Sequence, residues 1–226
     1  MKNDLAFELF RPLNPIDLIG ANGFYTVPQS QLICFYEPWD RFVISTISPD
    51  SDYTIAHYEL LPESAPFQLL QGKLCFMPTP NIRHQRISGN IVRELYGYVV
   101  AHKLGEVFYV LDVEFNENTI AQPDILFISN QRKDIAKNDA LRVVGAPDFI
   151  VEILLLYEFD DRVRKMQIYE ESDVLEYWIV VPTTETVEVY QNMDSKMVLT
   201  QTAQRGEVLH SVAIEGFSVE VDRVFG

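Results

Sequence analysis

The sequence predicts an α/β or α+β fold in which a central mixed β-sheet is flanked by helices and preceded by an N-terminal extension. Apolar residues recur at three- and four-residue spacing in residues 80–103, which is the period of an amphipathic helix. Short runs rich in branched and aromatic side chains follow this helix and recur after a second helical stretch at residues 160–172. The order helix, strands, helix, strands is typical of a mixed sheet covered by helices.

Residues 1–54 are predicted to form an extension ahead of a domain at residues 55–226. Prolines and glycines punctuate residues 1–30, which favours irregular structure there. Residues 31–47 contain two strand-like runs around Pro38-Trp39, so we expect a hairpin that turns at this pair. The hairpin is expected to pack on the core or on a partner chain through its aromatic side chains, Phe35, Trp39 and Phe42.

Within residues 55–226 the pattern predicts a hairpin, two helices and a series of strands. The hairpin spans residues 67–77 and breaks at Gln71-Gly72. Gly105 lies just past the long helix and is a candidate for its C-cap, since glycine tolerates the left-handed conformation found there. A polar loop follows at residues 130–145. Strands are predicted at residues 107–116, 120–129, 147–155, 175–181, 186–191, 197–202 and 217–221.

Charge and cysteine content limit the classes of function. The net charge of −15 counts against nucleic-acid binding, because affinity for phosphate comes mainly from basic side chains. Cys34 and Cys75 are far apart, which argues against a disulfide scaffold or a zinc ribbon and favours a reducing cytoplasm. No apolar run approaches the roughly 20 residues of a membrane span, so no membrane partner is expected. Residues 81–105 are locally basic, with Arg83, Arg86, Arg93 and Lys103.

Two predicted strands each carry an acid among apolar residues. Glu152 lies in the middle of a run that reads as a strand buried on both faces. A carboxylate there must be paired, metal-bound or protonated, because an isolated buried charge is very unfavourable. About one strand upstream, Asp124 follows a proline that enforces an extended entry into the next strand. The pair is the main chemical signal in the sequence.

Carboxylates on neighbouring strands form a candidate binding site for Mg²⁺, which prefers oxygen ligands and keeps waters that substrate phosphate can displace. Lys165, on the following helix, is a candidate for stabilising negative charge in a transition state. The alternative is structural, since Asp161 and Lys165 stand at i,i+4 and can pair on a helix surface. Asp124 and Asp148 both follow proline, so they can also be residues that start a strand or turn. Arg83, His84 and Arg86 are candidate phosphate contacts, against the alternative of a solvated basic turn.

Several short motifs occur in one order along the chain: Leu61-Pro62-Glu63, Met77-Pro78-x-Pro80, His84-x-x-Ile87, Gln122-Pro123-Asp124-Ile125, Ala146-Pro147-Asp148-x-x-Val151-Glu152-Ile153-Leu154, Asp161-Arg162-x-x-Lys165 and Glu176-Tyr177-Trp178-Ile179-Val180. Over roughly residues 55–226 this series resembles the Uma family of restriction endonucleases, which is abundant in cyanobacteria and belongs to the PD-(D/E)XK nuclease superfamily.

The resemblance implies a restriction-endonuclease-like fold and Mg²⁺-dependent hydrolysis of phosphodiester bonds in DNA, with Mn²⁺ as a substitute metal. Asp124 matches the metal-binding aspartate of the family and Glu152 matches the second acid. Lys165 matches a lysine moved from the strand to the next helix, and Leu154 occupies the strand position. Further expectations are a cytoplasmic location and a homodimer.

The chain departs from the family pattern at three places. Leu155-Leu156-Tyr157-Glu158 replaces the usual Ser-Pro-Ser/Thr run, Gln68 and Lys73 replace glutamates of the upstream hairpin, and Val181 replaces an acid. These departures keep a second reading open, in which a catalytically weakened relative acts as a binding or interaction module.

Electrostatics also predicts that neutralising Asp124 or Glu152 leaves the metal-free protein equally or more stable, since crowded carboxylates repel each other.

Overall fold

The computed structural model describes residues 31–37, 41–47, 52–59, 67–77, 79–137, 139–154 and 160–226. The chain divides into two compact units, Met1–Met77 and Pro78–Gly226. The family-like motifs that carry the candidate acids all lie in the second unit.

The first unit contains two hairpins and a short helix. Strands β1 (Gln31–Glu37) and β2 (Arg41–Ile47) pair antiparallel with Glu37 opposite Arg41, which confirms the expected hairpin. Its turn and the packing of its aromatic side chains lie outside the described residues, as does the irregular segment predicted at residues 1–30. The second hairpin is confirmed, with positive φ at both residues of its Gln71-Gly72 turn. The strands of this second hairpin are β3 (Phe67–Leu70) and β4 (Lys73–Phe76), and the short helix of the first unit is α2 (Ile55–Tyr58).

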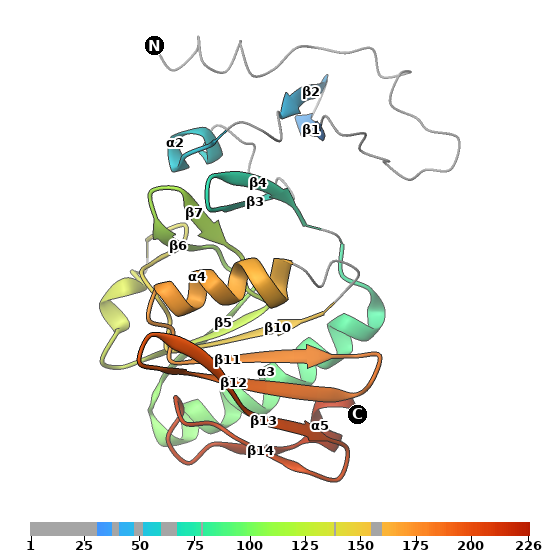
Figure 1. Cartoon of the computed structure of the whole chain (residues 1–226), viewed down its shortest axis with the longest axis vertical. Helices are drawn as coiled ribbons and strands as arrows, with labels where there is room; N and C mark the ends of the chain where they lie inside the picture. Colours follow the sequence, from blue (N-terminus) through green and yellow to red (C-terminus); the bar gives the residue numbers. More distant parts are fainter. Residues whose placement is uncertain are drawn as a thin grey trace. The chain divides into compact units, whose positions relative to one another are not determined.

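A six-stranded mixed sheet forms the centre of the second unit, in the order β13-β12-β11-β10-β8-β5 (Figure 1). Strands β10 and β11 run parallel, and the other neighbours run antiparallel. The predicted class, a mixed sheet flanked by helices, is therefore confirmed. The strands are β5 (Gly105–Tyr109), β8 (Ile125–Ser129), β10 (Phe149–Ile153), β11 (Glu176–Val181), β12 (Thr186–Met193) and β13 (Lys196–Gln204).

The long helix α3 (Ile82–His102) covers one face of this sheet. Its buried residues Ile87, Ile91, Leu95 and Val99 follow the predicted helical period and join the main apolar core. Alternate residues of β10, namely Phe149, Val151 and Ile153, contribute to the same core. The period of two therefore directs Glu152 to the opposite face of the sheet.

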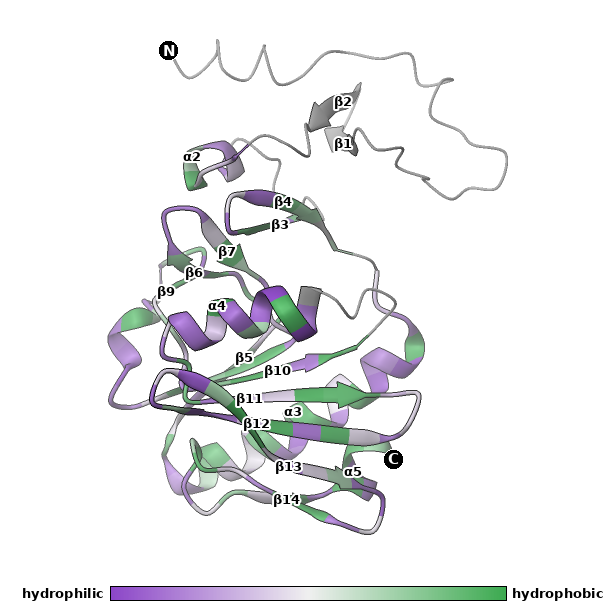
Figure 2. Cartoon of the chain, viewed as in Figure 1, coloured by the Kyte–Doolittle hydropathy of each residue, from purple (hydrophilic) through white to green (hydrophobic). Residues whose placement is uncertain are grey.

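The opposite face carries the second helical segment, which begins as a π-helical stretch, η3 (Asp160–Lys165), and continues as α4 (Met166–Glu171). Figure 1 shows α3 and α4 on opposite sides of the sheet. In Figure 2 the central strands are mostly hydrophobic, whereas α4 alternates between hydrophilic and hydrophobic residues. This alternation fits a helix with one face on the sheet, where Ile168 and Tyr169 are buried.

Two predicted strands are each divided in the structure. The stretch 107–116 is interrupted after Tyr109, where Val110 adopts positive φ, and a separate strand follows. The stretch 120–129 is interrupted at Gln122-Pro123, because proline cannot donate a ladder hydrogen bond. The separated pieces β6 (Val113–Asn116) and β7 (Thr119–Ala121) pair antiparallel, and β6 pairs in parallel with β9 (Val143–Val144).

The C-cap of α3 differs from the expectation. Lys103 takes the left-handed conformation with φ 56°, and the backbone N–H of Leu104 returns to the carbonyl of Val99. Gly105 serves a different purpose, because a Cβ there would lie 2.1 Å from the carbonyl oxygen of Ile128. Glycine is thus required by the close approach of β5 and β8.

The remaining elements follow the central sheet or connect its strands. The predicted strand at residues 217–221 is shorter and leads into a helix, and it pairs with a strand that the sequence pattern did not predict. The predicted loop at residues 130–145 contains one short 3₁₀ turn besides β9. These elements are β14 (Val208–His210), β15 (Ser218–Glu220), α5 (Val221–Phe225) and η2 (Lys133–Ile135).

Candidate active site

Asp124 lies directly before β8, beside the middle of β10. Ile125 is paired with Val151 in the antiparallel register, so Asp124 stands next to Glu152 on the neighbouring strand. The Asp124 carboxylate accepts a hydrogen bond at Oδ2 from the backbone N–H of Ile153, at 2.7 Å. His84 Nε2 lies 3.0 Å from the same oxygen. Asp124 is thereby linked to both β10 and α3.

Glu152 is buried in the middle of β10, with 3% of its surface exposed. Its Oε1 accepts hydrogen bonds from Lys165 Nζ at 2.8 Å and from the Tyr169 hydroxyl at 2.7 Å. Both donors come from the helical segment that covers this face of the sheet. The buried acid therefore has a cationic partner, as burial of a carboxylate requires.

Lys165 is also buried and lies between two carboxylates. Besides its bond to Glu152, its Nζ lies 3.1 Å from Asp161 Oδ1. The i,i+4 pair of Asp161 and Lys165, predicted as a structural alternative, is therefore present. It is not a pair on the helix surface, because Lys165 is buried and also contacts Glu152. The segment is held to the sheet by a further bond from the Tyr177 hydroxyl to the Asp161 carbonyl, at 3.0 Å.

The cluster of Asp124, Glu152, Asp161 and Lys165 has three carboxylates and one amine. Burial raises the pKa of Glu152 to about 8; Lys165 opposes the rise, while Asp161 and Asp124 add to it. Burial alone would lower the pKa of Lys165, but Asp161 and Glu152 outweigh it and raise that pKa. Neighbouring carboxylates thus add to the rise that burial causes in the Glu152 pKa, and they cause the rise in the Lys165 pKa, so the site favours a cation or a proton.

Each of the two strand acids uses only one carboxylate oxygen for protein contacts. Oδ2 of Asp124 and Oε1 of Glu152 each have two partners, and Oδ1 and Oε2 accept no hydrogen bond from the described residues. In the described part of the chain, His84 Nδ1 is the one fully buried side-chain N or O atom without a partner, so Oδ1 of Asp124 and Oε2 of Glu152 are not fully enclosed by protein. Two hard oxygen donors are therefore left accessible on neighbouring strands.

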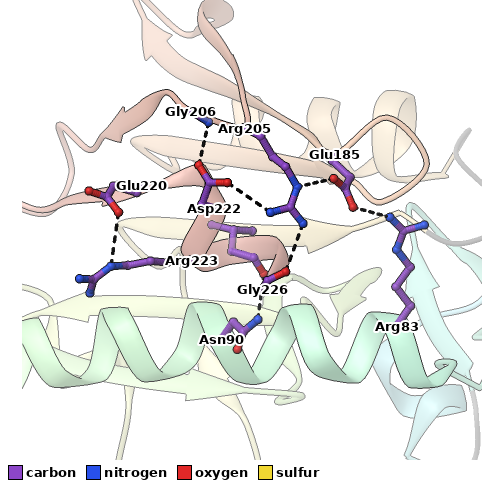
Figure 3. A network of polar contacts seen from close by, with 10 residues as sticks. Arg83, Asn90, Glu185, Arg205, Gly206, Glu220, Asp222, Arg223 and Gly226 are labelled. Carbon is purple, nitrogen blue, oxygen red and sulfur yellow. Dashed lines mark hydrogen bonds and ion pairs between the residues drawn. The ribbon is translucent and has the colours of Figure 1, made fainter.

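The predicted phosphate contacts Arg83, His84 and Arg86 occupy different environments. Arg83 pairs with Glu185 at 3.0 Å, and Glu185 also accepts from Arg205 in a surface network at the start of α3 (Figure 3). His84 is buried and bonds to Asp124, so it belongs to the acid cluster. Arg86 is exposed on the same helix turn.

Tyr169 is a member of the site that the sequence reasoning did not identify. Asp161, Lys165 and Tyr169 are spaced at i, i+4 and i+8, which places side chains on one face of a helix. This spacing is the signal that would have included Tyr169 with Lys165. The contact between His84 and Asp124 had no such local signal, since the residues are 40 positions apart.

Two of the three departures from the family pattern can be placed in the structure. Lys73 pairs with Asp52 at 2.9 Å in the first unit, and Val181 ends β11. The stretch Leu155-Leu156-Tyr157-Glu158 lies outside the described residues.

Within the described ranges, no group of three or more His, Cys, Asp or Glu side chains could hold a metal ion. Among the described helices, none is long and apolar enough to cross a membrane.

Comparisons with known proteins agree with this fold. A crystal structure of "a putative nuclease belonging to DUF820" from Anabaena variabilis ATCC 29413 superposes with a TM-score of 0.63 at 22% sequence identity, covering 76% of this chain and 97% of that chain. No curated protein matches the chain. The model of the Uma2 family, described as "Putative restriction endonuclease", matches residues 55–222, which include Asp124, Glu152 and Lys165. The chain therefore belongs to the Uma2 family of restriction-endonuclease-like proteins.

Proposed function

We propose that this protein is a Mg²⁺-dependent endonuclease that hydrolyses phosphodiester bonds in DNA. The observation that carries the proposal is the pair of accessible oxygens, Asp124 Oδ1 and Glu152 Oε2, in a cluster with excess negative charge. Mg²⁺ is commonly held by one or two carboxylates together with waters and substrate phosphate. The described residues form no metal-binding group of three or more, but a set of two carboxylates fits this ion and also Mn²⁺.

Asp124 and Glu152 are the residues that would hold the metal. A Mg²⁺ ion held there would supply a Lewis acid for the phosphate and lower the pKa of an attacking water molecule. Lys165 is positioned against Glu152 and would stabilise the negative charge that develops on the phosphate. Tyr169 donates to the same oxygen as Lys165 and fixes the orientation of the Glu152 carboxylate. Arg86, exposed at the start of α3, remains the candidate contact to the DNA backbone.

The test combines metal binding with cleavage. Calorimetry with Mg²⁺ or Mn²⁺ is expected to show binding to the wild type, with strong loss in Asp124→Asn and Glu152→Gln. Cleavage of plasmid DNA, single-stranded DNA and RNA is then compared in Mg²⁺ and in EDTA. Glu106→Gln, an exposed acid on β5, is the matched control and should behave as wild type. No binding at millimolar metal contradicts the proposal.

The variant Lys165→Met tests whether Lys165 stabilises charge on the phosphate independently of metal binding. We expect this variant to keep Mg²⁺ binding, because it removes a cation that competes for Glu152, while it loses cleavage. Lys137→Met, which changes an exposed lysine, is the control. Cleavage at the wild-type rate in Lys165→Met would remove Lys165 from the mechanism.

A second function, an interaction module that retains the nuclease fold, is favoured by two observations. The net charge is −15, and Arg83 is engaged by Glu185 in the surface network of Figure 3. Under this reading the protein binds no Mg²⁺ and Lys165 only neutralises Glu152 and Asp161. The same calorimetry distinguishes the two functions.

A further inference from the structure

His84 lies at the capped N-terminal end of α3 and contacts Asp124 of the acid cluster. It is the third residue of α3, and its backbone N–H is capped by the Asn81 side chain at 2.9 Å. One turn further along, Ile87 is buried in the apolar core. The His84 ring therefore sits on a rigid element, and only 5% of the residue is exposed.

The His84 ring contacts the protein through one nitrogen. Asp124 Oδ2 already accepts the backbone N–H of Ile153, so we assign Nε2 as the donor in its 3.0 Å contact with the same oxygen. The other nitrogen, Nδ1, is buried and has no partner among the described residues. An unpaired buried polar atom typically costs about 1–3 kcal/mol. The ring is therefore tied to the protein by a single hydrogen bond, the one from Nε2 to Asp124.

The contact occupies one oxygen of Asp124 and leaves the other accessible. The N–H of Ile153 and His84 Nε2 both point at Oδ2, which fixes the rotation of the carboxylate about its side-chain bond. Glu152 has the same arrangement, with Lys165 and Tyr169 both donating to Oε1. Metal-binding carboxylates are commonly oriented by such hydrogen bonds, and removing the outer partner typically lowers metal affinity about 10–100-fold.

We propose that His84 is a positioning residue that orients Asp124 so that Oδ1 is available to the metal ion. This inference rests on the proposed metal site and assigns His84 a role different from direct contact with phosphate. The ring acts through Asp124 and need not touch the substrate. A glutamine at this position can supply the same N–H donor, whereas phenylalanine keeps the ring volume without a donor.

The test measures Mg²⁺ and Mn²⁺ affinity of the full chain by calorimetry in His84→Phe and His84→Gln. We expect His84→Phe to lose about tenfold or more in affinity and His84→Gln to recover most of the loss. A purely structural His84 predicts a lower melting temperature for His84→Phe with unchanged metal affinity of the folded protein. That result overturns the proposal.

A second readout follows the ring itself. The ¹⁵N shifts of His84 in the wild type should identify a protonated Nε2, and the Nε2 signal should move on addition of Mg²⁺ in the wild type but not in Asp124→Asn. If Asp124→Asn still binds metal as the wild type does, the proposed metal site is wrong. If Asp124→Asn loses the metal and His84→Phe keeps it, only the role of His84 is wrong.

Discussion

Glu152 is an acid whose pKa is raised mainly by burial and is adjusted by three charged neighbours. Lys165 favours its ionised form, and Asp124 and Asp161 oppose it. The sequence alone predicts that neutralising this acid leaves the metal-free protein equally or more stable. The structure makes that expectation depend on pH, because the ionised carboxylate is also the partner of a buried lysine.

The stability of the metal-free protein is expected to fall as the pH rises from about 4.5 to about 8. In this interval the folded Glu152 keeps a proton that the unfolded chain releases, since its pKa is raised from 4.5 to about 8. The folded state then binds more protons, so a rise in pH favours unfolding. Below the interval this group does not change the stability with pH, and above it the loss of stability is complete and constant.

Glu152→Gln should remove this part of the pH dependence. Melting curves of wild type and variant between pH 4 and pH 9 measure the difference, which isolates Glu152 from other titrating groups. Glu106→Gln should keep the wild-type profile. Parallel profiles for wild type and Glu152→Gln would show that the fold does not hold Glu152 protonated.

At the scale of elements, the site depends on how closely β5, β8 and β10 approach one another. Asp124 reaches Glu152 because β8 lies between β5 and β10 in the sheet. The close approach of β5 and β8 at Gly105 leaves no room for a side chain, since a Cβ would meet the Ile128 carbonyl at 2.1 Å. Val110, directly after β5, donates its N–H to the Asp124 carbonyl at 3.1 Å. Both ends of β5 therefore constrain β8.

Gly105→Ala is expected to destabilise the protein by roughly 1–3 kcal/mol, as overpacking against backbone does. Gly97→Ala is the matched control, because Gly97 is exposed on α3 and a Cβ there meets nothing within 4 Å. This control should stabilise the helix by about 0.5–1 kcal/mol. Chemical denaturation of the three proteins gives the free energies of unfolding. Equal stability of Gly105→Ala and wild type contradicts the proposed close approach.

At the scale of the whole molecule, a net charge of −15 has to be reconciled with DNA as substrate. Several cations of the second unit already have carboxylate partners, including Arg83, Arg162 and Arg205. The acid cluster itself adds negative charge where the phosphate is expected. A divalent cation at Asp124 and Glu152 would therefore decide whether DNA is attracted or repelled.

We expect DNA binding to require a divalent cation. Fluorescence anisotropy of a labelled duplex with Lys165→Met, which is expected not to cleave, should show binding in Mg²⁺ and little in EDTA at the same ionic strength. Asp124→Asn combined with Lys165→Met should not bind in either condition. Tight binding in EDTA would place the DNA on a surface unrelated to the acid cluster.

The sequence by itself determined the helix at α3, the strand that carries Glu152, the mixed sheet and the order of the family motifs, because periodicity and strand composition are local properties. It also indicated Asp124 and Glu152, since acids beside or within apolar strands are conspicuous, and Lys165, through its place on the following helix and the family motif. Only the tertiary structure decided the partners of these residues. His84 and Tyr169 reach the acids through contacts between separate elements, and one-dimensional spacing does not say which distant side chains meet. The break at Pro123 follows from the proline itself, which has no N–H to donate to a ladder. The break after Tyr109 was decided by the tertiary structure, in which Val110 takes positive φ and donates its N–H to the Asp124 carbonyl.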